Sequence, residues 1–231
     1  MTTLNTYTPL EEEAGADEYL AAHIDPEGDY LYRLYRATNI HTIHGRMASG
    51  HLQGRLLKML VHMIRPKNIL EVGTFSGYSA ICMAEGLGEG GKLYTFEIND
   101  EMEDFTRPWI EGSPVADKID FRIGDAAEEA PKLGILFDMA FVDGDKRTYA
   151  EMYEKLLPII RPGGYILADN TLWDWHVIDP TYDHDHQTIG IRRFNDLIAK
   201  DKRVEKVILP LRDGLTLIRK KPGAFTDSNE Y

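Results

Sequence analysis

Hydrophobic positions in the first third of the chain recur with the spacing of helices. Two helical stretches precede residue 45, and the second has an apolar face formed by Tyr30, Leu31, Leu34, Tyr35 and Ile40. Residues 51–64 repeat the pattern as an amphipathic helix, which Pro66 ends. The sequence therefore predicts an N-terminal helical extension over residues 1–45, whose acidic run at residues 11–13 is interpreted as a solvated helix start.

From residue 69 onward, short apolar runs alternate with helical stretches. The runs predict strands at residues 69–72, 92–98, 118–123, 137–142, 165–168, 204–209 and 215–219. Helices are predicted between them, starting near Ala80, at residues 101–110, after Asp125, at 146–160 and at 188–200. This alternation favours a doubly wound α/β domain with a mostly parallel sheet of seven strands and crossover helices.

The last two predicted strands are joined by residues 210–214, Pro-Leu-Arg-Asp-Gly. A short connection with Asp-Gly suits a hairpin, so the final strand is expected to run antiparallel. The chain shows no repeats, no low-complexity linker and no second set of elements. Residues 1–231 are therefore interpreted as a single domain, and residues 221–231 as a flexible tail.

Composition and charge argue against several classes of function. The chain is 43% hydrophobic and 28% charged, as in ordinary soluble proteins, and its net charge of −12 argues against a nucleic-acid partner. No apolar run approaches ~20 residues, which argues against a membrane span, and the N-terminus lacks the pattern of a secretory signal. The single cysteine, Cys82, is expected to pack in the core. A cytoplasmic protein is the simplest interpretation.

A small-residue turn separates the strand at residues 69–72 from the helix that follows it. In doubly wound domains, ligands bind beyond the carboxyl ends of the strands, and Gly73 would let a ligand approach the backbone closely. The turn has glycines at 73 and 77 but none at 75 or 78, so the Gly-x-Gly-x-x-Gly pattern of dinucleotide sites is missing. The turn is either structural or holds an adenosyl ligand without a pyrophosphate.

Acidic residues follow several predicted strands. Glu97 ends the second strand a little over twenty residues after Gly73, where an acid can hydrogen-bond both hydroxyls of a ribose. A solvated carboxylate at a strand end is the alternative, and the position favours the ribose.

Three oxygen-bearing side chains, Asp143, Asp169 and Asn170, follow the fourth and fifth predicted strands. If these strands are neighbours, the three side chains converge, and carboxylate and amide oxygens suit a hard cation such as Mg²⁺, Ca²⁺ or Mn²⁺. The alternative is that Asp143 caps the next helix and Asp169 binds backbone in a turn. Spacing alone does not choose between these interpretations.

Lys146 stands three residues after Asp143, at the start of a predicted helix. A lysine beside a divalent cation loses its proton more readily, so Lys146 is a candidate general base, with a plain surface lysine as the alternative. Asp145 either caps the helix or faces the ligand. Trp173 and Trp175 would suit the walls of a site for a planar substrate, or they pack in the core.

No functional site is predicted at the histidines. His184-Asp185-His186 lies in a polar loop without a fourth ligand nearby in sequence, so it is interpreted as a solvated loop. His41, His44, His51 and His62 lie on helical segments and receive no role.

Three segments together resemble a known family. They are residues 71–79 (Glu-Val-Gly-Thr-Phe-Ser-Gly-Tyr-Ser), residues 141–146 (Phe-Val-Asp-Gly-Asp-Lys) and residues 169–173 (Asp-Asn-Thr-Leu-Trp). In this order and spacing they resemble the cation-dependent O-methyltransferases that use S-adenosylmethionine, the family of the catechol and caffeoyl-CoA O-methyltransferases. The resemblance runs from about Met47 to Arg219 and implies a Rossmann-like methyltransferase fold with an antiparallel last strand.

The resemblance also implies roles for individual residues. A divalent cation, Mg²⁺ first, with Ca²⁺ or Mn²⁺ as alternatives, would be held by Asp143, Asp169 and Asn170, and Lys146 would be the base. S-Adenosylmethionine would contact Ser49, Glu71, Gly73, Thr74, Ser79, Glu97, Ala126 and Asp145. The family mostly forms homodimers, so a homodimer is expected here.

The chain departs from the family pattern where the acceptor is chosen. The N-terminal helices and residues 175–187 do not align, Gly144 replaces a larger residue, and Ala126 lies in a loosely matching segment. The favoured function is metal-dependent methyl transfer to a hydroxyl of a catechol-like small molecule or CoA ester. The alternatives are a nicotinamide-dependent oxidoreductase and a non-catalytic adenosyl-binding protein. The missing glycine pattern argues against the first, and Lys146 with the three metal donors against the second.

Overall fold

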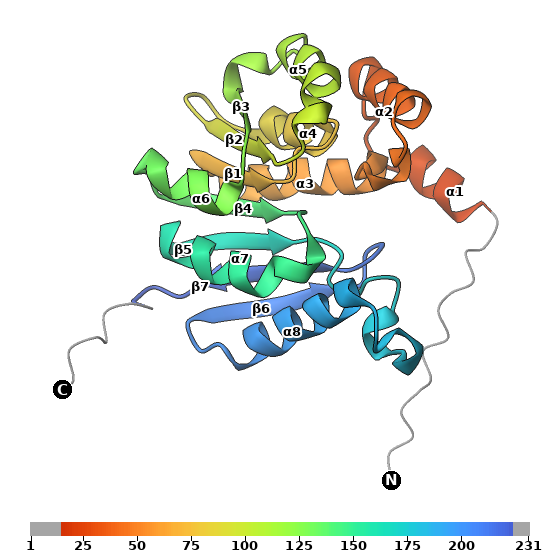
Figure 1. Ribbon diagram of the computed structural model, residues 1–231. Helices are drawn as coiled ribbons and strands as arrows, with labels where there is room; N and C mark the ends of the chain where they lie inside the picture. Colours follow the sequence, from red (N-terminus) through yellow and green to blue (C-terminus); the bar gives the residue numbers. More distant parts are fainter. Residues whose placement is uncertain (1–14, 224–231) are drawn as a thin grey trace.

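The computed structural model of the chain describes residues 15–223 (Figure 1). The acidic run at residues 11–13 and residues 224–231 of the predicted tail lie outside the described residues. Within the described part, no helix is both long and apolar enough to cross a membrane.

A seven-stranded sheet forms the centre of the fold. Its strands are β1 (Asn68–Val72), β2 (Lys92–Glu97), β3 (Ile119–Ile123), β4 (Phe137–Val142), β5 (Ile160–Ala168), β6 (Val204–Leu209) and β7 (Leu215–Lys220). They lie in the order β3-β2-β1-β4-β5-β7-β6. β7 is antiparallel to both of its neighbours, whereas the other pairings are parallel. The doubly wound topology and the antiparallel last strand are therefore confirmed.

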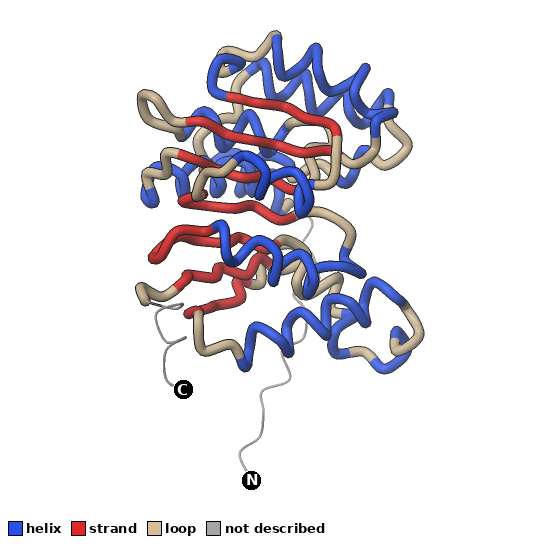
Figure 2. The backbone as a smooth tube through the Cα atoms, turned by 60° about the vertical axis from the view of Figure 1, so that its left-hand side comes forward, coloured by secondary structure: helices blue, strands red, loops and turns tan. Residues whose placement is uncertain are grey.

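Helices cover both faces of the sheet (Figures 1 and 2). One core joins the sheet to α2 (Asp29–His41), α3 (Gly50–Ile64), α4 (Tyr78–Gly86) and α5 (Glu103–Glu111), and it includes Cys82. The other core joins it to α6 (Ala126–Glu129), α7 (Tyr149–Leu156) and α8 (His186–Lys200). The short α1 (Ala16–His23) lies outside these cores and contacts α3. The strands carry apolar side chains on both faces because both faces are covered.

The segment between β4 and β5 differs from its prediction. A single helix at residues 146–160 was expected, but α7 is flanked by 3-10 turns at Lys146–Thr148 and Leu157–Ile159. The predicted turn at residues 161–164 is a bulge inside β5: the pairing register shifts there and Gly163 has a φ of 81°. A bulge keeps the strand paired while inserting extra residues, so β5 begins five positions earlier than expected.

The carboxyl ends of the parallel strands meet at one edge of the sheet. The order of the strands reverses between β1 and β4, and ligands of doubly wound domains bind at this point. The pairing continues one residue beyond the strands: the N–H of Asp143 donates to the carbonyl of Val72, and the N–H of Asp169 to that of Val142. The first residue after each strand is therefore held in register with its neighbour.

Candidate active site

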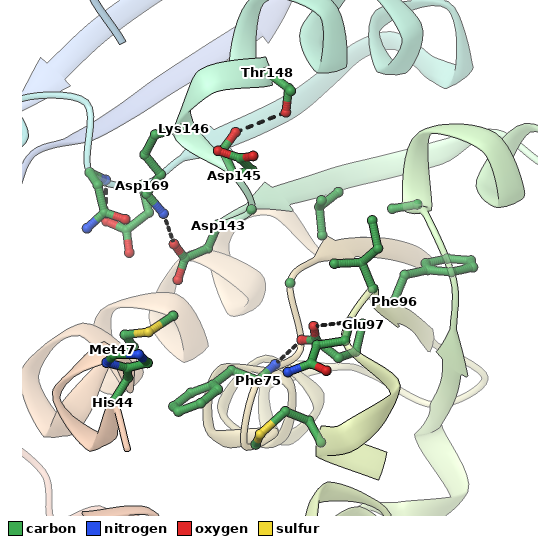
Figure 3. A pocket seen from close by; sticks show the side chains of 18 of the residues that line it. His44, Met47, Phe75, Phe96, Glu97, Asp143, Asp145, Lys146, Thr148 and Asp169 are labelled. Carbon is green, nitrogen blue, oxygen red and sulfur yellow. Dashed lines mark hydrogen bonds and ion pairs between the residues drawn. The ribbon is translucent and has the colours of Figure 1, made fainter. Parts of the chain in front are cut away.

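A cavity of about 1110 Å³ opens at the carboxyl ends of the strands. Its wall combines the loops after β1 to β5 with residues 41–47 and with the β6–β7 turn. Single small-molecule sites have volumes of about 300–1,000 Å³, so this cavity has room for a cofactor and a second molecule. Figure 3 shows its two ends: Glu97 and Phe75 lie at one, and Asp143, Lys146 and Asp169 at the other.

Glu97, at the end of β2, has its carboxylate held by two backbone groups. Oε2 accepts from the N–H of Phe75 at 2.8 Å and Oε1 from the N–H of Asn99 at 2.9 Å. Each carboxylate oxygen has a further lone pair, so both can still accept from hydroxyls in the cavity. The geometry suits the two hydroxyls of a ribose.

Gly73 follows β1 and lines the cavity, with a φ of 91°. A Cβ at this position would lie 2.4 Å from the carbonyl oxygen of Asp143. The prediction attributed this glycine to the approach of a ligand, but its first requirement is the approach of two backbone loops. A side chain here would push apart the loops after β1 and β4.

Glu71 lies behind this loop, fully buried in β1, and does not line the cavity. It accepts hydrogen bonds from Ser79 Oγ at 2.6 Å and Thr95 Oγ1 at 2.5 Å, and Thr95 in turn bonds Thr74 at 2.6 Å. Burial raises the pKa of Glu71 to about 8, although the two hydroxyl donors act in the opposite direction. Glu71, Thr74 and Ser79 thus form a buried network beneath the β1–α4 loop.

The other residues predicted to contact S-adenosylmethionine occupy different positions. Ala126 and Asp145 line the cavity. Asp145 also caps the turn that begins at Lys146, and hydrogen bonds from Arg147 lower its pKa, so both interpretations of Asp145 fit the structure. Ser49 is buried just before α3 and does not line the cavity.

Asp143 and Lys146 form an ion pair at the other end of the cavity. Lys146 Nζ lies 2.6 Å from Asp143 Oδ1, and its side chain is largely buried. The ammonium lies 5.5 Å from the ring centre of Tyr149 and 6.0 Å from that of Trp173, so aromatic faces flank it. Lys146 is therefore a positioned group of the cavity wall, not a plain surface lysine.

Asp169 and Asn170 follow β5 beside this pair. Asp169 is buried, and burial together with the nearby Asp143 carboxylate raises its pKa well above the usual value for aspartate. Asn170 Nδ2 donates to Asp213 Oδ2 at 3.2 Å, which turns the amide oxygen away from Asp213. The structure thus brings Asp143, Lys146, Asp169 and Asn170 together.

These side chains fit a hard divalent cation by their chemistry. Two carboxylates lie close together beside a single lysine. Burial and their mutual repulsion raise the pKa of Asp169, and a cation would relieve the repulsion. Within residues 15–223 no group of three His, Cys, Asp or Glu side chains is arranged for a metal ion. A cation here would depend on the Asn170 amide oxygen as its third protein ligand, as predicted.

The loop after β5 has an unusual backbone. Asn170, Trp173, Asp174 and Trp175 all have positive φ angles between 48° and 62°, as does Arg212 in the facing β6–β7 turn. Such conformations cost about 1–3 kcal/mol each in non-glycine residues and concentrate where function requires them. Of the two tryptophans proposed as cavity walls, Trp173 lines the cavity and Trp175 does not.

Residues 184–186 were predicted to be a solvated loop, but they lead directly into α8, which begins at His186. Asp185 caps α8, and its Oδ2 accepts from the N–H of Thr188 at 2.8 Å and from its hydroxyl at 2.6 Å. By contrast, His41 and His44, which received no role from the sequence, line the cavity with Met47 (Figure 3 labels His44 and Met47). No motif marks these residues, so the sequence carried no signal for them.

Three further residues around the site were missed. Gln53 of α3 contacts Asp169, Arg212 contacts Gln53, and Asp213 contacts Asn170. Two of them, Arg212 and Asp213, lie in the segment that the sequence identified only as a hairpin connection. Their contacts arise from folding, and local spacing does not reveal them.

Comparisons with known proteins agree with this geometry. Residues 21–221 match the family model for O-methyltransferases. "Tricin synthase 2" of Oryza sativa subsp. japonica is 37% identical over 228 residues, which cover 92% of this chain and 77% of that protein. "Caffeoyl-CoA O-methyltransferase" of Mesembryanthemum crystallinum is 38% identical over 186 residues, which cover 75% and 73%. The crystal structure of an O-methyltransferase from Bacillus cereus in complex with SAH superposes with a TM-score of 0.81 at 31% identity, covering 89% of this chain and 96% of that one.

Proposed function

The chain belongs to the O-methyltransferase family as an S-adenosylmethionine-dependent enzyme, and from this premise we propose a divalent cation and a catechol-like acceptor for its reaction. The acceptor would be a vicinal dihydroxy aromatic compound, either a small molecule or a CoA ester, methylated on one hydroxyl. The observation that carries the proposal is the convergence of Asp143, Lys146, Asp169 and Asn170 at one end of the cavity. The family assignment removes the nicotinamide-dependent oxidoreductase and the non-catalytic protein as alternatives.

We assign the eight predicted donor-binding residues two roles according to their positions. The four that line the cavity would contact S-adenosylmethionine directly, and they are Gly73, Glu97, Ala126 and Asp145. Glu97 would accept from the ribose hydroxyls, because both of its oxygens are oriented by backbone N–H groups. The other four are buried and do not line the cavity, and they would shape the loops that the donor rests on: Ser49, Glu71, Thr74 and Ser79.

At the other end of the cavity, Asp143, Asp169 and Asn170 would hold the cation. When bound, a divalent cation there would stabilise negative charge on the acceptor oxygens. Lys146, in its neutral amine form, takes the proton from the reacting hydroxyl, and that oxygen attacks the methyl carbon of the donor as the carbon–sulfur bond breaks. The electrons of that bond neutralise the sulfonium. Because no covalent enzyme intermediate is needed, holding the reactants in line is the main contribution of the protein.

Two observations support an aromatic acceptor. Trp173 lines the cavity and lies beside the Lys146 ammonium, so a planar ring near the base would pack against an aromatic face. Two similar proteins are named for tricin and caffeoyl-CoA, and a protein of related sequence is expected to take a related acceptor.

The deciding experiment is methyl transfer from labelled S-adenosylmethionine to a simple catechol, with Mg²⁺ and then with excess EDTA. We expect EDTA to abolish transfer. We also expect Asp169→Ala to abolish it while binding of the donor, measured by calorimetry, is preserved. Transfer that survives EDTA would remove the cation from the proposal, and an equal loss of turnover and donor binding in Asp169→Ala would remove Asp169 from the cation site.

A homodimer and a cytoplasmic location, without nucleic-acid or membrane partners, stay predictions from the sequence. Sedimentation velocity of the purified chain tests the dimer.

A further inference from the structure

A buried glutamine of α3 connects the proposed cation site to the β6–β7 turn. Gln53, on α3, is 2% exposed. Its Nε2 donates to Asp169 Oδ2 at 2.6 Å, across 116 positions of sequence. Its Oε1 accepts from a guanidinium nitrogen of Arg212 at 3.0 Å, across 159 positions. Both ends of the amide are therefore occupied by residues that the fold brings together.

Arg212 determines which way this amide points. A guanidinium only donates hydrogen bonds, so the carbonyl oxygen of Gln53 must face Arg212 and its NH₂ group must face Asp169. Arg212 is itself held, because it donates to the backbone carbonyl of Ser49 and adopts a φ of 48° in the β6–β7 turn. The amide of Gln53 thus has one orientation, with a donor aimed at Asp169.

The contact orients Asp169 without adding an opposite charge to it. One carboxylate oxygen accepts from Gln53 and the other from the N–H of Asn170 at 2.9 Å. Each oxygen retains a lone pair, and these two bonds determine the direction of both remaining lone pairs. Because an amide is neutral, it orients the carboxylate without cancelling the charge that a cation needs.

We propose that Gln53 and Arg212 are positioning residues for divalent-cation binding at Asp169. Arg212 orients Gln53, and Gln53 orients the carboxylate, so the two act in series. The inference rests on the proposed function, since it presupposes a cation at Asp169. A purely structural role, in which Gln53 only attaches α3 to the sheet, would change thermal stability but not the affinity for a metal ion.

The test is a titration of the full chain with Mn²⁺, followed by electron paramagnetic resonance, without donor or acceptor. Loss of an outer partner of a metal ligand typically costs about 10- to 100-fold in affinity, and we expect this range for Gln53→Met. Arg212→Met should weaken Mn²⁺ binding less, and Arg212→Lys, which keeps a charged donor, should restore most of it. Because the two residues act in series, Gln53→Met combined with Arg212→Met should bind no more weakly than Gln53→Met alone.

Two further variants separate the possible outcomes. Asn195→Leu is the matched structural control. It removes the 2.8 Å hydrogen bond that Asn195 donates to the carbonyl of Thr171, in the loop that follows Asp169, and Asn195 makes no hydrogen bond to Asp169 itself. It should leave Mn²⁺ affinity unchanged. Asp169→Ala tests the proposed function itself, and Mn²⁺ binding that survives this substitution would refute the cation site.

If wild type binds Mn²⁺ and Asp169→Ala does not, unchanged affinity in Gln53→Met would overturn the positioning role. So would an equal loss in Asn195→Leu. If Gln53→Met does not fold, the Arg212 variants decide: weak binding by Arg212→Met with recovery in Arg212→Lys supports the inference, and equal affinities overturn it.

Discussion

The two ends of the cavity are built in different ways. The donor end is the end of the cavity at Glu97 and Phe75. Its hydrogen bonds span short distances in sequence: Glu71 bonds Ser79, eight positions away, and Glu97 bonds Phe75, 22 positions away. The acceptor end is the end at Asp143, Lys146 and Asp169. There, Asp169 accepts a hydrogen bond from Gln53, 116 positions away, and Asn170 donates one to Asp213, 43 positions away. The hydrogen bonds of Glu71 and Glu97 thus stay within residues 71–99, whereas those of Asp169 and Asn170 reach distant segments.

Backbone conformation shows the same contrast. In the donor loop, positive φ angles fall on Gly73 and Gly77 and on one other residue, Phe75. The acceptor end has four consecutive or near-consecutive non-glycine residues in this region, within 170–175. The donor loop thus places one non-glycine residue in this costly region, whereas the loop after β5 places four there.

The largest effect should come from removing the base. Lys146→Met is expected to lower kcat by about 10²- to 10⁴-fold, because general base catalysis contributes a factor of this size. Donor affinity should stay unchanged, since Lys146 lies at the acceptor end. Steady-state kinetics with a catechol and calorimetry with S-adenosylmethionine measure the two quantities.

Lys132→Met is the matched control for this substitution. Lys132 forms an ion pair with Glu129 three positions away, as Lys146 does with Asp143, but on the surface. Its kcat should equal that of wild type. Wild-type turnover in Lys146→Met would remove Lys146 as the base.

A smaller effect is expected at the donor end. Glu97→Ala should weaken S-adenosylmethionine binding by about 10- to 100-fold, since hydrogen bonds to a charged group contribute roughly 1.5–3 kcal/mol. Mn²⁺ affinity should not change if the two ends are independent. Asp100→Ala, an exposed carboxylate three positions on, is the control. A loss of Mn²⁺ affinity in Glu97→Ala would contradict the division into two ends.

The smallest effect is a pH dependence of stability that comes from Glu71. Its pKa is about 8 in the folded chain and 4.5 in a free side chain, so between these values only the folded state keeps the proton. Stability without donor therefore falls as pH rises, by about 1.4 kcal/mol per pH unit from this group. Glu71→Gln, which resembles the protonated acid, should lack this contribution.

Denaturant unfolding of both chains at pH 6 and pH 7 measures the difference. The stability of Glu71→Gln relative to wild type should rise between these pH values. A stability difference that is the same at the two pH values would mean that Glu71 is ionised in the folded chain at both pH 6 and pH 7.

The sequence by itself indicated the family, the doubly wound sheet and its antiparallel last strand. It also placed Asp143, Lys146, Asp169 and Asn170 after the fourth and fifth strands, but their convergence required these strands to be neighbours, which the structure shows. What the sequence indicated follows from patterns that span a few residues. Apolar periodicity defines a strand, and the residue after a parallel strand must lie at the same edge as the residue after its neighbour. Strand-end chemistry is therefore visible before the structure is known.

Only the tertiary structure decided what holds those side chains in place. Nothing in the spacing around Gln53 or Arg212 indicates a contact with Asp169, because it depends on how α3 and the β6–β7 turn pack against the sheet. The bulge in β5 and the need for Gly73 beside the Asp143 carbonyl are likewise invisible locally. Hydrogen bonds between segments far apart in sequence require a defined distance and direction, and only the folded chain sets both.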